Sequence, residues 1–296
     1  MTARTSKTYP GRPRGGLATW VSLGLGLAFL ASLWAVDASP QRLIAVPGEV
    51  LIFLGRFFLP DMFFLRDPET GRWLCSQDWA ACQSALGTHW SGVVGYGRDQ
   101  VVAGIIESIH IAWIGTIIGA VLSLGLAFLG ANTLFPTLSK GVKALSSTIR
   151  AVPEILLAIY LIPIVGLGAT AGALAIGLHS VGMLSKLGAE VVESIDMGPV
   201  EAVEAAGGSK IAAIRYAVLP QVIPEILAQW LFRFELNLRA SAILGVVGAG
   251  GVGALLLNAL RYRQFDKAAA VLIMTVLAVL AIDMLSSALR RRLTRI

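Results

Sequence analysis

The sequence predicts an all-α membrane protein with about six transmembrane helices. Hydrophobic residues make up 56% of its 296 residues, charged residues make up 14%, and the mean hydropathy is +0.74. The apolar residues occur in blocks of roughly twenty, the length that a helix needs to cross a bilayer core. These blocks lack the alternation of barrel strands, and backbone in lipid must satisfy its own hydrogen bonds, so the spans are predicted to be helices.

Six blocks give the candidate spans. They cover approximately residues 17–36, 105–130, 149–167, 171–187, 222–244 and 268–289. The first block precedes Val36-Asp37-Ala38, which could pass for a signal-peptidase site, so a cleaved leader is the alternative to a first transmembrane helix. A block of about twenty residues exceeds the usual apolar core of a leader, which favours the retained helix.

The charges predict how the spans are oriented, because Lys and Arg collect in short cytoplasmic segments. The tail of residues 1–16 has four basic residues and no acidic one, and the C-terminal tail carries four arginines, Arg290, Arg291, Arg292 and Arg295. Both termini are therefore expected in the cytoplasm, which requires an even number of spans. Arg261, Arg263 and Lys267 would lie outside in this topology, close to a membrane end.

Residues 37–100 are predicted to form a long periplasmic loop, because they hold seven acidic residues against five arginines. Part of this loop, residues 43–65, is apolar and aromatic but interrupted by charges, so we expect it to lie along the membrane surface. The loop also contains both cysteines, Cys75 and Cys82. They could form a disulfide in the periplasm, and two unpaired packing thiols are the alternative.

Several classes of function leave signatures that this sequence lacks. The basic residues lie at membrane edges and form no separate basic domain, so no nucleic-acid partner is expected. There is no G-x-x-x-x-G-K-[ST] loop, so any ATP and magnesium would be held by a partner subunit. No cluster of His or Cys indicates a metal site, and no Ser, His and Asp pattern indicates catalysis, so no cofactor or catalytic residue is expected in this chain.

Glycines are abundant, 32 in all, and recur as Gly115-xxx-Gly119 and in the run of residues 245–253. This spacing lets neighbouring helices approach closely.

Charged residues inside the predicted spans are candidates for a translocation path or gate. Each costs about 2.5 to 3.5 kcal/mol if it faces lipid, so we expect these residues to face a cavity, another helix or one another. Glu235 and Arg239 are four residues apart and can form a structural salt bridge on one helix face, whereas Arg233 points elsewhere. Anchoring of helix ends is the alternative for those near a membrane edge. Together with the polar residues beside them, the candidates for the path or gate are Glu107, Ser108, His110, Arg150, Glu154, Arg233, Glu235, Asn237 and Arg239.

The longest predicted cytoplasmic interval, residues 188–219, combines acidic residues with alanine and glycine. Alanine favours a short helix, and we expect glycine and then Leu219-Pro220 to end and redirect it. Glu201-Ala202-Val203, followed by three residues, Gly207, nine residues, Ala217, one residue and Leu219-Pro220, resembles the EAA loop of ABC importer permeases. Val203 and Ala217 depart from the usual residues.

This resemblance implies a coupling loop at about residues 190–220 that docks on an ATPase subunit. The residues that it assigns to coupling are Glu201, Ala202, Glu204, Gly207, Leu219 and Pro220.

Further motifs resemble phosphonate-type permeases within that family: residues 150–154, residues 177–182, and residues 237–241 leading into the glycines of 248–253. The resemblance covers about residues 100–296 and implies a type I ABC importer permease core (MetI-like) over residues 101–296. It also implies a phosphonate or related substrate such as phosphite, hypophosphite or a phosphate ester. Methionine-type permeases are the nearest alternative, because they share the glycine run and a stretch similar to 261–265.

The partners implied are a second copy of the chain, ABC ATPase subunits, a periplasmic binding protein and membrane lipid, in a bacterial inner membrane. An ion-driven secondary transporter is a further alternative, but it would usually show inverted repeats. An intramembrane enzyme would need convergent nucleophiles or metal ligands.

The topology can be tested by labelling single cysteines from outside the cell. We expect an impermeant maleimide to label cysteines placed in residues 37–100 and to leave cysteines in either tail unlabelled until the membrane is permeabilised. Labelling of a tail in intact cells would contradict this orientation.

Overall fold

The structure is a computed structural model that describes residues 15–35, 45–51 and 79–293. Within these ranges all regular elements are helices. The chain divides into two units, residues 1–56 and residues 57–296. In the first unit, α1 (Gly15–Ala35) confirms the helix predicted for the first block, and residues 45–51 form a short exposed helix within the segment expected at the membrane surface.

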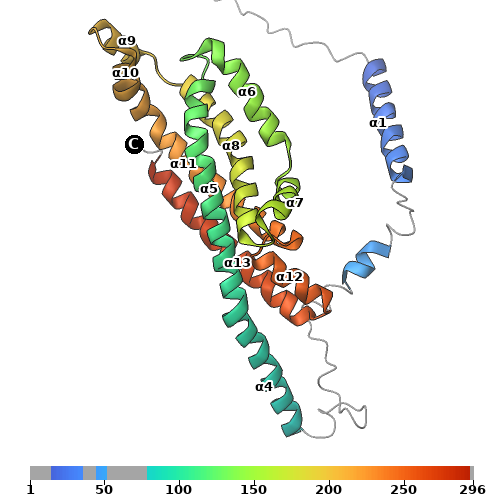
Figure 1. Cartoon of the computed structure of the whole chain (residues 1–296). Coiled ribbons are helices and arrows are strands. Elements are labelled where there is room, and N and C mark those ends of the chain that lie inside the picture. Colours follow the sequence, from blue (N-terminus) through green and yellow to red (C-terminus); the bar gives the residue numbers. More distant parts are fainter. Residues whose placement is uncertain (1–14, 36–44, 52–78, 294–296) are drawn as a thin grey trace, which may run out of the picture. The chain divides into compact units, whose positions relative to one another are not determined.

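The second unit is a bundle of helices (Figure 1). In chain order it contains α4 (Trp79–Tyr96), η2 (Gly97–Val101), α5 (Val102–Gly130), α6 (Pro136–Ala151), α7 (Glu154–Val165), α8 (Ala169–Glu193), α9 (Gly198–Ala205), α10 (Lys210–Ala213), η3 (Ile214–Val218), α11 (Leu219–Leu244), η4 (Gly245–Val247), α12 (Val252–Arg261) and α13 (Phe265–Leu293). The other five predicted blocks fall on α5, the junction of α6 with α7, α8, α11 and α13.

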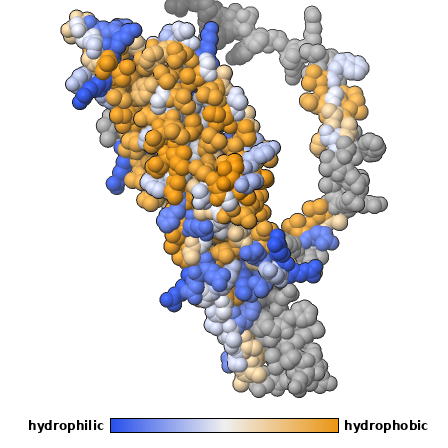
Figure 2. All heavy atoms as spheres, in the orientation of Figure 1, coloured by the Kyte–Doolittle hydropathy of each residue, from blue (hydrophilic) through white to orange (hydrophobic). Residues whose placement is uncertain are grey.

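Among the residues that the structure describes, three helical stretches are long and apolar enough to cross a membrane: Trp79–Gly130, Lys210–Val247 and Phe265–Leu293. The pair α6 and α7 makes a fourth if the two are one bent span. The remaining predicted block of this unit lies in α8, which has more than half of its residues buried among other helices, so few of its side chains face lipid. Figure 2 shows the resulting apolar surface along the bundle, with hydrophilic residues toward its two ends.

The prediction that residues 149–167 form a single straight helix is wrong. The chain breaks at Val152 and Pro153, and the two helices on either side meet at 81°. Proline has no N–H to donate and forces the preceding residue into extended backbone, as seen for Val152 with φ −81° and ψ 119°. The break leaves α6, an amphipathic helix that we did not predict, and the short apolar helix α7.

Residues 79–100 are also helical and not an open loop, because α4 continues through the π-helical turn η2 directly into α5. Cys82 is buried on α4, whereas Cys75 lies outside the described residues. Their pairing stays a prediction.

The expectation that Leu219-Pro220 ends a helix is wrong. Helix runs from Lys210 to Leu244 through α10, η3 and α11. Pro220 lies in the first turn of α11, where proline is tolerated, and it follows directly on a π-helical turn, which accommodates an irregular backbone pattern.

The glycine run of residues 245–253 forms a turn, and the close approach predicted for it is confirmed at its ends. A Cβ atom on Gly253 of α12 would collide with the carbonyl oxygen of Ala242 in α11, and one on Gly245 would lie 2.8 Å from the nitrogen of Ala254. Gly248, Gly250 and Gly251 have φ of 91°, 78° and 75°, a backbone region that glycine enters without strain. The turn reverses the chain between α11 and α12, and α12 itself was not predicted.

The close approach predicted for Gly115-xxx-Gly119 is confirmed between α5 and α8. A Cβ atom on Gly115 would lie 2.7 Å from Cγ2 of Ile176, and one on Gly119 would collide with Ser180. Gly177 on α8 faces Ile118 of α5 in the same way. Small residues therefore set the spacing of the two helices that form the centre of the bundle.

We expect Gly119→Val to destabilise the purified protein by about 1 to 3 kcal/mol, because the added atoms overpack the contact between α5 and α8. Gly125→Val is the matched control, since a Cβ atom at Gly125 of the same helix meets nothing within 4 Å. Thermal unfolding in detergent measures the difference. Equal stability of the two variants would contradict this account of the packing.

Candidate functional site

Helix α11 places polar residues on two of its faces. Arg233, Glu235 and Asn237 are buried, at 7%, 4% and 0% exposure. Residues four apart lie on one helix face, so Arg233 and Asn237 share one face while Glu235 and Arg239 share another. Each face belongs to a separate cluster of side chains, one toward α5 and α8 and the other toward α13.

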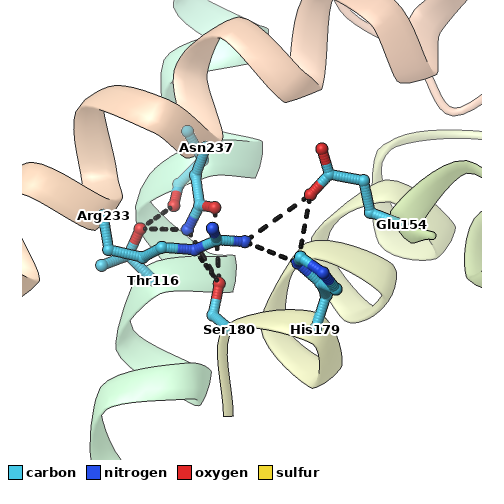
Figure 3. Close-up of polar contacts among 7 residues, drawn as sticks. Thr116, Glu154, His179, Ser180, Arg233 and Asn237 are labelled. Atoms are coloured by element: carbon cyan, nitrogen blue, oxygen red, sulfur yellow. Dashed lines mark hydrogen bonds and ion pairs between the residues drawn. The ribbon is translucent and has the colours of Figure 1, made fainter. Parts of the chain in front are cut away.

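The first cluster, which we call the Arg233 cluster, joins four helices (Figure 3). Its members are Arg233 and Asn237 of α11, Thr116 of α5, His179 and Ser180 of α8, and Glu154 of α7. The Nε atom of Arg233 donates to Ser180 Oγ at 3.0 Å, and Asn237 Nδ2 donates to Ser180 Oγ at 3.1 Å and to Thr116 Oγ1 at 2.8 Å. These bonds fix the guanidinium from the α8 side.

Two groups face the outer end of the Arg233 guanidinium. His179 Nδ1 lies 2.8 Å from Arg233 Nη2, and Glu154 Oε2 lies 3.6 Å from the same nitrogen. A guanidinium only donates, so the Nδ1 atom of His179 accepts the short bond. An Nδ1 atom that accepts cannot also donate to the Glu154 oxygen 3.4 Å away. The Glu154 carboxylate is therefore held by charge attraction at long range.

The second cluster, which we call the Glu235 cluster, links α11 to α13. Glu235 accepts from Arg239 Nη2 at 2.7 Å and from Arg290 Nη2 at 3.3 Å, and Asp283 lies 3.7 Å from Arg239. The predicted pair of Glu235 and Arg239 is thus present. Two acidic and two basic groups neutralise one another here, which is the pattern of a structural ion cluster.

The side chains of the other candidate path residues belong to neither cluster. Ser108 is buried and fastens the glycine turn, because its Oγ accepts from Val252 N–H at 2.9 Å and its carbonyl accepts from Ser241 Oγ at 3.1 Å. Glu107 and His110 lie near it on α5 with exposed side chains, and Arg150 is exposed at the end of α6. Of the nine candidates, the structure gathers Glu154, Arg233 and Asn237 at one place.

No pattern in the sequence paired Arg233 with His179, Ser180 or Thr116, which come from other helices. The available signal was the polar pair His179-Ser180 inside the glycine-bounded motif of residues 177–182. Two adjacent polar residues amid small ones in a buried helix indicate a partner across the helix interface.

The predicted coupling loop is a helix, a turn and a second helix at one end of the bundle (Figure 1). Gly207 has φ 82°, and its N–H donates to Glu204 O at 2.9 Å, so α9 ends in a left-handed residue. Ser209 then caps α10 by accepting from Ala212 N–H. Pro220 is exposed and Leu219 half-buried, and the side chains on the outside of the loop include Glu201, Ala202, Glu204, Ile211 and Tyr216.

The base of the loop is anchored by Glu193 at the end of α8, beyond the fourth predicted span. Its Oε1 accepts from Lys143 Nζ at 2.7 Å and from Asn132 N–H at 2.6 Å. The Lys143 bond, followed by the Asn132 bond, lowers the pKa of the Glu193 carboxyl from its ordinary value. This contact ties the end of α8 to α6 and to the turn before it.

Comparison with known proteins identifies relatives over most of the bundle. The family described as "Binding-protein-dependent transport system inner membrane component" matches residues 119–295. The phosphite transport system permease protein PtxC of Stutzerimonas stutzeri is 41% identical over 197 residues, which are 66% of this chain and 72% of that protein. The phosphate-import permease protein PhnE of Mycolicibacterium smegmatis is 41% identical over 189 residues, 63% of this chain but only 36% of that protein.

More distant relatives share the fold. The probable D-methionine transport system permease protein MetI of Vibrio cholerae is 27% identical over 165 residues, 52% of this chain and 72% of that protein. Among solved structures, the inward-facing MetNI methionine ABC transporter matches with a TM-score of 0.58 at 21% identity, covering 65% of this chain and 95% of that one.

Glu193→Gln should lower the stability of the purified protein at pH 7 by about 1 kcal/mol, because it removes a charged partner of Lys143. The folded-state pKa of this group is depressed, so the stabilisation is present above the unfolded-state pKa of about 4.3 and is lost as the pH falls through the folded pKa. The deficit of the variant should therefore shrink as the pH falls below about 4 in detergent unfolding experiments.

Glu190→Gln is the control, since the Glu190 side chain is 54% exposed and pairs along its own helix with Lys186. A deficit of Glu193→Gln that stays the same at every pH would show that the charge of Glu193 is not what anchors the loop.

Proposed function

The chain belongs to the family of binding-protein-dependent transport system inner membrane components, and from that membership we propose that it forms the translocation path of an ATP-driven importer for phosphonate or a related phosphorus oxyanion. The observation that carries the substrate class is the 41% identity to permeases named for phosphite and phosphate import. Methionine permeases match at 27% identity, which disfavours the main alternative. Family membership likewise disfavours an ion-driven transporter.

In this proposal the loop from α9 to α10 docks on an ATPase subunit, which binds ATP and magnesium. The exposed side chains of Glu201 and Glu204, and the apolar side chains of Ile211 and Tyr216, support a contact surface. The turn at Gly207 keeps this surface compact, so that a groove on the partner can close around it.

We further propose that the membrane unit works as two copies, since ABC importers have two membrane halves and this chain supplies one. A periplasmic binding protein delivers the oxyanion, closure of the ATPases moves the two coupling loops, and the path switches its access from outside to inside. The Arg233 cluster is the part of this chain that we assign to the path. The neutralised Glu235 cluster, in contrast, holds α13 against α11.

The orientation follows from the same assignment. The coupling loop and the arginine-rich end of α13 lie toward one end of the bundle, and α4 and α12 lie toward the other (Figure 1). This arrangement supports a cytoplasmic loop and a cytoplasmic C-terminus in a bacterial inner membrane. The charge pattern of the sequence supports the same side for the N-terminus, with residues 37–100 facing the binding protein.

The proposal is tested by transport in proteoliposomes that contain the chain together with its ATPase and binding protein. We expect ATP-dependent uptake of phosphite and not of methionine. Gly207→Leu should uncouple ATP hydrolysis from uptake, because a side chain at φ 82° strains the turn, and Glu201→Arg should weaken ATPase docking by reversing a charge on the loop. Both variants should reduce uptake at least tenfold.

Gly125→Leu is the control for the added side chain, since Gly125 is an exposed glycine of α5 with open space around its Cα and lies outside the segment proposed to face the binding protein. All variants should insert and unfold like the parent chain. Normal co-purification with the ATPase and normal uptake by both loop variants would show that the coupling assignment is wrong.

A further inference from the structure

The Arg233 guanidinium is positioned by neutral groups, while its charge is balanced at a distance. Ser180 Oγ and His179 Nδ1 hold it at 3.0 and 2.8 Å, but the only carboxylate within ion-pair distance, among the described residues, is Glu154 at 3.6 Å. Charge-assisted bonds between guanidinium and carboxylate usually measure about 2.7 to 2.9 Å. The Arg233 guanidinium is therefore held firmly in position, whereas the Glu154 carboxylate is held loosely.

The exposure of the side chains shows from which side an anion could enter. The Arg233 side chain is 9% exposed, that of His179 is 16% exposed and that of Glu154 is 28% exposed. The least exposed side of the cluster is thus behind the guanidinium, where Ser180, Asn237 and Thr116 lie, and the most exposed side is at the carboxylate. Figure 3 shows these groups on opposite sides of the guanidinium. An anion that takes the place of the Glu154 carboxylate meets the Arg233 Nη2 atom, which His179 Nδ1 holds in position.

Glu154 is the first residue of a short helix whose backbone is irregular at both ends. Helix α7 has only 12 residues and begins at the break after Val152 and Pro153. It ends at Gly166 and Gly168, which have φ of 89° and 128°. An added Cβ atom on either would meet nothing within 4 Å, so glycine is needed here for the backbone conformation and not for close packing. Arg233, His179 and Ser180, in contrast, are on long helices in the centre of the bundle.

Charge balance restricts what can replace the carboxylate. A buried guanidinium left without a counter-charge is strongly unfavourable, so Glu154 can leave only if another anion arrives. The planar fork of an arginine side chain matches the paired oxygens of a phosphorus oxyanion as well as it matches a carboxylate. The exchange keeps the net charge of the cluster when the arriving anion carries a single charge.

We propose that Arg233 forms a membrane-embedded binding site for the transported phosphorus oxyanion, that Ser180 and His179 position its guanidinium, and that Glu154 occupies the site as a resident carboxylate which the oxyanion displaces. The inference rests on the proposed function, because it takes the cargo to be such an anion. Displacement frees the start of α7 from α8 and α11, so that cargo binding and movement of the broken helix are linked.

The test is equilibrium binding of phosphite to the full-length chain in complex with its ATPase. Glu154→Gln keeps the shape of the side chain but removes the competing charge, and should lower the Kd for phosphite at least tenfold. Arg233→Gln should abolish saturable binding. Asp99→Asn is the control for net charge, since Asp99 is 75% exposed on η2, and should bind phosphite like the parent complex.

Thermal unfolding separates a binding site from a purely structural salt bridge. Phosphite should raise the Tm of Glu154→Gln and should leave unchanged the Tm of the double variant Glu154→Gln/Arg233→Gln, in which no buried charge lacks a partner. A structural bridge would give Glu154→Gln a lower Tm that phosphite does not restore, together with unchanged phosphite affinity, and that result overturns the inference.

Transport by the parent complex keeps the two proposals apart. If the parent complex imports none of phosphite, phosphate and methylphosphonate, the proposed function fails and the inference fails with it. If the parent complex imports phosphite while Glu154→Gln binds it no more tightly than the parent, only the inference about Glu154 fails.

Discussion

The arrangement of the bundle depends on the cost of placing charge where water is scarce. Helix α11 carries Arg233 and Glu235 deep among other helices, and each requires a counter-charge or a hydrogen-bonding partner from a neighbour. Because the two residues point to different faces, the helix has to be flanked on one side by α5 and α8 and on the other by α13. The positions of three helices around α11 are in this sense determined by two side chains.

The same cost explains why the two faces differ in character. The face toward α13 is neutral within itself, with Glu235 between two arginines and Asp283 beside one of them. The face toward α8 has one fixed cation and one loosely held carboxylate. The neutral Glu235 cluster is suited to holding helices together. The Arg233 cluster, whose carboxylate is loosely held, can accept another anion in its place.

Much of the fold could be predicted from the sequence, because long apolar blocks report the length of a membrane span directly. The blocks on α1, α5, α8, α11 and α13 were located in this way. The break at Pro153 was missed because the hydropathy of residues 149–167 is continuous across it, although the proline itself was visible. Helix α4 was missed because its residues are less apolar and were counted with a charged loop.

The polar sites show where sequence reasoning stops. The pair of Glu235 and Arg239 was predictable because both residues are on one helix and four positions apart. The partners of Arg233 come from 53 and 54 residues earlier in the chain, and Glu154 from further still, so only the packing of α7, α8 and α11 brings them together. The packing in turn depends on Gly115 and Gly119, whose small size was visible but whose contacts with α8 were not.

The continuity of helix from Lys210 to Leu244 has a geometric consequence. Arg233 lies about 35 Å along this rod from the start of α10, at 1.5 Å per residue. The rod contains one turn, residues 214–218, with the wider π-helical hydrogen bonding, which accommodates one residue more than an α-helical turn. That extra residue changes the rotation about the helix axis between the two ends of the helix. It therefore determines the angle between the direction in which the loop projects and the direction in which the Arg233 side chain faces.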